Sequence, residues 1–169
     1  MERPIPKEIK LVVFDLDDTL WTPELYMMNG PFRKDKLTKK VFDQYNTEIR
    51  IHSGAKKVLR ELYLKHPHIK IGVASRTDYP DWAEECLDLL EIDNGVKLNQ
   101  IVHYKEIYPG DKKTHFRALQ KKSKLEFKEM VFFDNENRNI VSVGQLGVVS
   151  IYTPRGMRYE NWEEALTKY

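Results

Sequence analysis

The stretch KLVVFDLDDTLW, residues 10–21, decides how this chain folds. Residues 11–14 are an uninterrupted apolar run, which is typical of a strand buried on both faces of a sheet. The run ends abruptly at Asp15, and the chain continues with Asp17, Asp18 and Thr19. Because ligands of open parallel sheets bind outside the carboxyl ends of the strands, we look for function at this end.

Three further apolar runs predict the neighbouring strands, at residues 69–75, 130–134 and 147–152, with a weaker candidate at 100–106. Between the runs, apolar residues recur three and four apart, which is typical of helices. The predicted helices span residues 54–66, 81–91, 112–125, 136–146 and 159–169. Strands that alternate with helices predict an α/β fold, a Rossmann-like parallel sheet with helices on both faces.

The segment 21–52 departs from this alternation. It contains Pro23, Gly30 and Pro31, then a charged stretch and a short apolar-polar alternation. A second full domain would need more room. We therefore expect one domain over residues 1–169, with a loop or hairpin flap inserted at 21–52.

Composition excludes several classes of protein. Lys and Arg number 28 and Asp and Glu 26, and this near-balance argues against a dedicated nucleic-acid binder. The apolar runs are far too short to span a bilayer, and the first ten residues do not resemble a signal peptide. One cysteine, Cys86, excludes an internal disulfide framework and a cysteine-rich zinc site. We expect a cytoplasmic protein, monomeric by default, with no nucleic-acid or membrane partner.

Polar residues beside separate strands supply the groups that phosphoryl transfer needs. These are Asp15, Asp17, Ser75, Asp134 and, in a turn before a predicted helix, Lys112. Clustered carboxylates repel one another unless a cation joins them, and oxygen ligands around an open position favour Mg²⁺. A carboxylate can then attack phosphorus while lysine and hydroxyl groups hold the transferring oxygens. Each piece alone is more simply a turn, a helix cap or a surface charge, but their joint placement favours catalysis.

Four motifs resemble those of the haloacid dehalogenase (HAD) superfamily, in the superfamily's own order. FDLDDTL (14–20) resembles the first motif, DxDx[TV], while Ser75, the lysine of YPGDK and FFD (132–134) match the others. The longer strings FDLDxTLW, ASRT, EIYPGxKxTHF and MVFFDxExRNI are similar to the magnesium-dependent phosphatase-1 branch. The resemblance implies a HAD-like phosphatase fold, capless or with a small flap after the first strand.

The resemblance also implies catalytic roles. Asp15 is the expected nucleophile, which forms an aspartyl phosphate. Asp17 is the expected general acid, which protonates the leaving oxygen and later activates water. Ser75 is expected to bind a phosphoryl oxygen. Lys112, in preference to Lys113, is expected to pair with Asp15 and the phosphate.

Mg²⁺ is the implied cofactor. The side chains of Asp15 and Asp134 and the main-chain carbonyl of Asp17 are its expected ligands. Asn135 stands where an acidic residue is common in the superfamily, which removes a negative charge near the metal. Its amide could still bond to a water on the metal, and Glu136 could supply the missing charge.

Supporting contacts are implied as well. Thr19 is expected to brace the first motif by hydrogen bonding. The main-chain N–H groups of Leu16, Asp17 and Arg76 are expected to help bind the phosphate. Residue 18 is Asp where this branch usually carries tyrosine, although other superfamily phosphatases accept Asp there.

No segment is long enough for a full cap domain, so we expect an open site. The resemblance suggests phosphotyrosine in proteins, or sugar phosphates such as fructosamine phosphates, as substrates. Either contact with the leaving group or simple packing is expected for four flap residues, Trp21, Tyr26, Phe32 and Arg33. Two other functions stay open, a protein serine phosphatase of the RNA-polymerase-tail type and a catalytically silent binding module.

Overall fold

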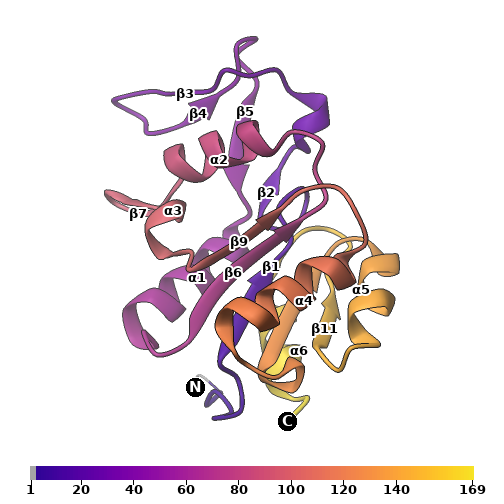
Figure 1. Ribbon diagram of the computed structural model, residues 1–169. Helices are drawn as coiled ribbons and strands as arrows, with labels where there is room; N and C mark the ends of the chain where they lie inside the picture. The colour runs from indigo at the N-terminus through magenta and orange to yellow at the C-terminus, as the bar shows by residue number, and fades with distance from the viewer. Residues whose placement is uncertain (1–2) are drawn as a thin grey trace.

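Five parallel strands form the central sheet of the protein, seen in a computed structural model that describes residues 3–169. They are β1 (Leu11–Phe14), β6 (Lys70–Ser75), β9 (Tyr104–Ile107), β10 (Met130–Asp134) and β11 (Val149–Tyr152). Their order across the sheet is β11-β10-β1-β6-β9 (Figure 1). The chain leaves β1 toward β6 on one side and returns to β10 on the other. A crevice therefore forms beside the carboxyl ends of β1 and its neighbours.

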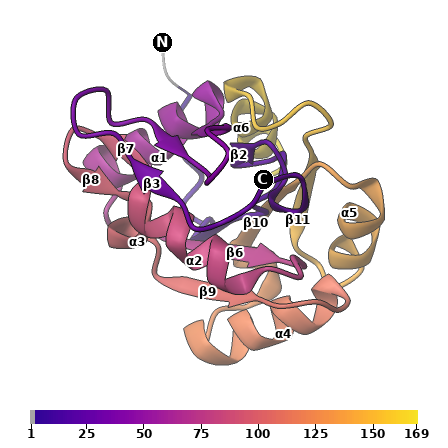
Figure 2. The ribbon, with the colours of Figure 1, turned by 90° about the horizontal axis from the view of Figure 1, so that it is seen from above.

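Helices cover both faces of the sheet. They are α1 (Ser53–Lys65), α2 (Pro80–Leu89), α3 (Leu98–Ile101), α4 (Lys112–Ser123), α5 (Asn137–Gly144) and α6 (Tyr159–Leu166). Val12 and Phe14 pack with α1, α2 and α6, whereas Leu11 and Val13 pack with α4 and α5, since successive strand residues face opposite sides. Figure 2 shows α1 and α6 on one side of the sheet and α4 on the other. No helix in the described part of the chain is long and apolar enough to cross a membrane.

The predicted α/β fold is confirmed, and the predicted helices and strands are present with ends displaced by a few residues. The candidate strand at 100–106 is wrong in its first part. Leu98–Ile101 forms α3, which buries Leu98 and Ile101 three residues apart, and β9 begins only at Tyr104. The predicted helix at 81–91 ends earlier, because Glu91–Asp93 forms a small strand, β7, that pairs with β8 (Val96–Lys97). A 3-10 turn, η2 (Phe127–Glu129), precedes β10.

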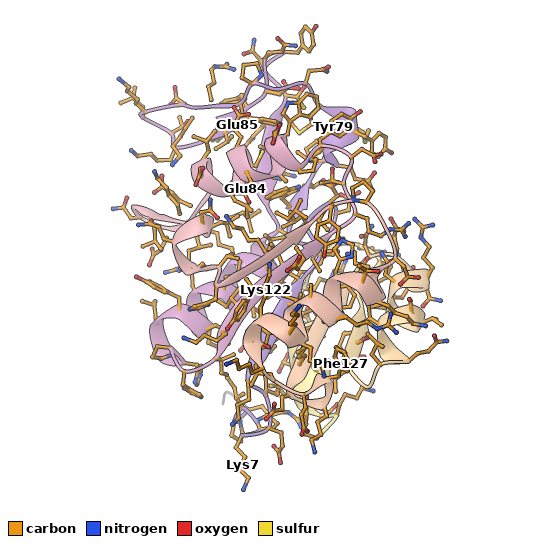
Figure 3. The ribbon with its side chains drawn as sticks, in the orientation of Figure 1. Lys7, Tyr79, Glu84, Glu85, Lys122 and Phe127 are labelled. Atoms are coloured by element: carbon orange, nitrogen blue, oxygen red, sulfur yellow. The ribbon has the colours of Figure 1, made fainter. Side chains whose placement is uncertain are left out.

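Residues 21–52, called here the flap segment, form an antiparallel sheet above the carboxyl edge of the main sheet (Figure 1). Its elements are β2 (Trp21–Thr22), η1 (Leu25–Met27), β3 (Arg33–Lys34), β4 (Val41–Phe42) and β5 (Glu48–Ile51), in the sheet order β2-β5-β4-β3. The Phe32 N–H donates to Glu85 Oε1 at 2.5 Å, and Lys34 pairs with Glu91 at 2.7 Å. Figure 3 shows Glu85, on α2, and Tyr79, which directly precedes α2. Both lie at the end of the molecule that carries the flap segment.

Candidate active site

Strand register brings the predicted site residues together at one edge of the sheet. Phe14 lies opposite Phe133, and the Asp15 N–H continues the ladder by donating to the Phe133 carbonyl at 3.0 Å. Asp15 therefore lies beside Asp134, the last residue of β10, while Ser75 ends β6 on its other side. The side chains of Asp15, Ser75 and Asp134 are all buried. Parallel pairing alone thus gathers residues that are far apart in the sequence.

Lys112 joins these strands. Its Nζ donates to Asp15 Oδ1 at 3.0 Å, to Asp134 Oδ2 at 2.9 Å and to the Ala74 carbonyl at 2.7 Å, which uses all three of its protons. The side chain is 1% exposed. Burial alone would lower the pKa of Lys112, but the two carboxylates raise it above its usual value. Lys112 is therefore a cation held between two carboxyl groups.

The start of α4 explains why Lys112 and not Lys113 enters the site. The Asp111 side chain caps the helix by accepting from the Lys113 N–H at 2.7 Å. Lys112, the first helical residue, then points toward the sheet edge. Lys113 points outward and donates to Gln145 Oε1 at 2.6 Å.

The carboxyl group of Asp15 is strongly perturbed. Burial raises its pKa to about 8, and the nearby Asp134 adds to the shift, while Lys112 opposes it. Thr19 donates its hydroxyl to Asp15 Oδ2 at 3.0 Å, so each oxygen of Asp15 has a separate partner. A carboxyl group that is buried and unstable as an anion needs positive charge beside it.

Asp17 is held by the flap segment. Its Oδ1 accepts from the Trp21 indole N–H at 2.9 Å and from the Leu25 N–H at 3.1 Å. Burial raises the pKa of Asp17, and these two hydrogen bonds oppose the shift. The turn that carries Asp17 closes on the Leu16 carbonyl and places Asp18 at φ +54°, a conformation that Asp tolerates better than most residues. Asp17 can therefore keep its proton at a higher pH than an exposed carboxyl group.

Asn135 contacts the two oxygens expected to bind the metal. One terminal atom of its amide lies 3.0 Å from Asp15 Oδ2, 3.1 Å from the Asp17 main-chain oxygen and 3.3 Å from Thr19 Oγ1. Mg²⁺ binds oxygens in an octahedron at about 2.1 Å, so ligands at adjacent corners lie about 3.0 Å apart. With its oxygen turned inward, Asn135 would hold Mg²⁺ together with Asp15 Oδ2 and the Asp17 carbonyl oxygen. These oxygen donors therefore fit Mg²⁺.

Asp134, the expected third ligand, has other partners. Its Oδ1 accepts from the Glu136 N–H at 2.8 Å, and its Oδ2 accepts from Lys112 and from Asn139 Nδ2 at 3.0 Å. Both oxygens are engaged by N–H donors because the chain turns into α5 directly after β10. Among residues 3–169, no three Asp, Glu, His or Cys side chains gather as a metal site. The Asn135 amide thus lies beside the other two expected ligand oxygens, while the Asp134 carboxylate accepts from N–H donors.

A cleft of about 340 Å³ opens over these groups. Arg76, expected at the phosphate, lines it and donates to Asn139 Oδ1 at 3.3 Å, while its Nε is buried without a hydrogen-bond partner. Of the four candidate flap residues only Tyr26 lines the cleft; Trp21 holds Asp17, Phe32 packs against Trp82, and Arg33 lies over the Phe42 ring. The lining residues are Asp15, Asp17, Glu24, Tyr26, Ser75, Arg76, Thr77, Asp78, Tyr79, Pro109, Gly110, Lys112, Glu136, Arg138 and Asn139.

Two buried residues outside the predicted set support the site: Asn139, which the sequence patterns missed, and His115, which they offered only as a weak candidate for contact with substrate. Asn139, 4% exposed, links Asp134 to Arg76. His115 Nε2 lies 2.9 Å from the Ser75 carbonyl and 2.7 Å from that of Tyr108, and its ring stacks on Tyr108. It therefore braces the end of β6 and does not reach the cleft. The available signal was a polar residue on the buried face of each helix.

Comparison with known proteins shows which proteins this chain is similar to. The sequence profile of the acid phosphatase family matches residues 7–169. The human protein Magnesium-dependent phosphatase 1 is 36% identical over 161 residues, which cover 95% of this chain and 86% of that protein. A HAD-like hydrolase superfamily protein of Schizosaccharomyces pombe is 37% identical over 82% of each chain. A HAD family enzyme of Bacteroides thetaiotaomicron, crystallised with magnesium and inorganic phosphate, shares the fold at a TM-score of 0.64 and 13% identity, over 91% of this chain and 98% of that one.

Proposed function

Because this chain belongs to the acid phosphatase family, in the magnesium-dependent phosphatase-1 branch of the HAD superfamily, we propose that it is a magnesium-dependent phosphomonoesterase. One observation carries the proposal. Asp15 is buried with Lys112 on its Oδ1, and on its Oδ2 lies one terminal atom of the Asn135 amide, which is 3.1 Å from the Asp17 carbonyl oxygen; these separations suit neighbouring ligands of Mg²⁺. A nucleophile with a fixed cation on one side and a cation site on the other suits attack on a phosphate dianion.

Asp15 Oδ2, the Asp17 carbonyl and the Asn135 amide oxygen would hold Mg²⁺. When bound, the ion supplies positive charge that offsets the negative charge of Asp15 and of the phosphoryl oxygens. Lys112 supplies a second positive charge from the opposite side. Asp134 is assigned a different role from the one first expected, since it holds Lys112 and Asn139 in place.

The reaction proceeds in two displacements at phosphorus. Asp15 Oδ1 attacks, a new P–O bond forms to Asp15, and the bond to the leaving oxygen breaks. Asp17 donates its proton to that oxygen, which its raised pKa favours. Asp17 then takes a proton from a water that attacks the same phosphorus, which releases inorganic phosphate and restores Asp15.

Ser75 and Arg76 complete the phosphate site from the end of β6. Ser75 is buried at the cleft floor, where its hydroxyl can donate to a phosphoryl oxygen. The guanidinium of Arg76 and the main-chain N–H groups of Leu16, Asp17 and Arg76 add donors. His115 holds this loop by its contact with the Ser75 carbonyl.

We propose phosphotyrosine, in preference to sugar phosphates, as the substrate class, and the support is the aromatic side chains that line the cleft. Tyr26, 66% exposed, and Tyr79, 38% exposed, both line the cleft. The ring of Tyr79 stacks on that of Trp82, with 4.5 Å between the ring centroids. Aromatic rings at a cleft mouth suit an aromatic leaving group. In this proposal the flap segment 21–52 is a small flap on a single phosphatase domain, and its Glu24 and Tyr26 line the cleft.

Release of phosphate from p-nitrophenyl phosphate, with and without Mg²⁺, tests the proposal. Wild type should turn over only with Mg²⁺. Asp15→Asn should lose turnover, while Asp81→Asn, a matched change on the exposed start of α2, should retain it. Turnover that persists in Asp15→Asn would show that another nucleophile does the chemistry. Wild type that is inactive on aryl, peptide and sugar phosphates alike would favour the binding-module alternative.

A further inference from the structure

We propose that Asn135 is a two-position group, whose amide closes the metal site when Mg²⁺ is absent and binds the ion after a half-turn. The inference rests on the proposed function, because it concerns the same metal site. Its basis is the single amide atom that lies 3.0 Å from Asp15 Oδ2, 3.1 Å from the Asp17 carbonyl oxygen and 3.3 Å from Thr19 Oγ1.

With nitrogen at this position, Asp15 Oδ2 and the Asp17 carbonyl oxygen have hydrogen-bond donors even without a metal. The NH₂ group carries two protons, which it donates to Asp15 Oδ2 and to the Asp17 carbonyl oxygen. The hydrogen bond to the carboxyl group of Asp15 is of the stronger, charge-assisted kind when that group is ionised. The amide then occupies the place between these oxygens that the ion would otherwise fill.

With oxygen at this position, the same contacts require a cation. Two oxygens then face a third at 3.0 and 3.1 Å, and the Thr19 hydroxyl has only one proton to share between Asp15 and Asn135. Oxygens at these separations without a proton repel one another. These are also the separations of adjacent ligands around Mg²⁺, about 3.0 Å. The oxygen orientation is therefore the metal-bound one.

A half-turn about the Cβ–Cγ bond of Asn135 exchanges the two atoms, since an amide is nearly symmetric in shape. An aspartate at this position has no N–H to donate. Without metal it would place a third acidic oxygen against Asp15 and Asp17, and with metal it would add a negative charge. Asparagine thus weakens metal binding but stabilises the metal-free site.

Two substitutions separate these effects. Asn135→Asp keeps a ligand oxygen and removes the N–H donor, and Asn135→Leu removes both. Asn137→Asp, on an exposed residue two positions on, is the matched control for added charge. The measurements are the melting temperature in EDTA and in Mg²⁺, the Mg²⁺ dissociation constant by calorimetry, and the NMR signals of the Asn135 side-chain amide.

We expect Asn135→Asp to melt below wild type in EDTA, yet to bind Mg²⁺ about tenfold tighter, the scale of changes around metal ligands. Asn135→Leu should melt lower in EDTA and also bind Mg²⁺ more weakly, and Asn137→Asp should match wild type. In wild type, the amide proton signals of Asn135 should shift on Mg²⁺ addition as their hydrogen bonds are lost.

Three results would overturn the inference. They are an Asn135→Asp protein that is as stable as wild type in EDTA, equal Mg²⁺ affinity in wild type and Asn135→Leu, or Asn135 amide signals that ignore Mg²⁺. If wild type hydrolyses p-nitrophenyl phosphate with Mg²⁺ but gives any of these results, the proposed function stands and the two-position role of Asn135 is wrong. If wild type gives the expected results for Asn135 but shows no phosphatase activity, the two-position role of Asn135 stands and the proposed function is wrong.

Discussion

Lys112 Nζ lies 3.0 Å from Asp15 Oδ1, although 97 positions separate the two residues in the sequence. The pair is buried, and Asp134 Oδ2 accepts from the same ammonium group at 2.9 Å. A lysine between two buried carboxyl groups serves stability and catalysis together. Its removal leaves both carboxyl groups without their cation.

Lys112→Met should therefore destabilise the protein by about 3–5 kcal/mol, the range for breaking a buried ion pair from one side. It should also abolish Mg²⁺-dependent phosphatase activity. Lys113→Met, at the half-buried neighbour that points away from the site, should change neither. Urea unfolding and phosphate release measure the two effects. Equal stability of the two variants would mean that Lys112 contributes nothing net to the fold.

Asp17→Asn should lower kcat about 10²- to 10⁴-fold, the usual contribution of a general acid or base. Asparagine keeps a side-chain oxygen for Trp21 and Leu25, so the loop should stay in place. The loss should be larger for an alkyl phosphate than for p-nitrophenyl phosphate, whose leaving oxygen needs a proton less. An equal loss on both substrates would count against proton donation by Asp17.

Stability of the metal-free protein should depend on pH through Asp15. Burial raises its pKa from 3.8 to about 8. Between these two pH values, Asp15 in the folded protein holds a proton that the unfolded chain has released. The free energy of unfolding should then fall as the pH rises toward 8, and this contribution is fully lost above it. Urea unfolding in EDTA from pH 5 to 9 measures the slope. The slope should be smaller in Asp15→Asn and unchanged in Asp81→Asn, and an undiminished slope in Asp15→Asn would assign it to other groups.

Tyr26→Ala should raise KM for a phosphotyrosine peptide about 2- to 10-fold, which corresponds to the 0.5–1.5 kcal/mol of an aromatic contact. KM for a sugar phosphate should stay the same, because that leaving group has no ring. Tyr45→Ala, an equally exposed change on the flap segment outside the cleft, is the control. Steady-state kinetics with both substrates measure these KM values. A parallel rise in KM for both would remove the argument for phosphotyrosine.

Local patterns were sufficient to predict the framework. The apolar run at 130–134 became β10 with the same bounds, because a strand buried on both faces has to be apolar throughout. The helix predicted at 112–125 was equally readable from its spacing, and it begins at Lys112 as expected. The strand predicted at 100–106 was wrong in its first part, since a short apolar run carries no period that separates a strand from a turn of helix.

The site divides in the same way. The sequence by itself determined that Asp15, Asp17, Ser75, Lys112 and Asp134 meet, because each stands at the carboxyl end of a strand or the start of the next helix. Tertiary structure decided where their atoms point. It turned Asp134 toward Lys112 and Asn139, put the Asn135 amide beside Asp15, and made Trp21 a partner of Asp17.

The physical reason is that side-chain direction depends on long-range pairing. A one-residue change in how a strand registers, or in where a helix begins, turns each side chain to another face. The choice between neighbours such as Asp134 and Asn135 therefore depends on contacts with β1 and α4, which are distant in the sequence. Local residue patterns carry the chemistry of a site, and the packing of distant segments selects the atoms that perform it.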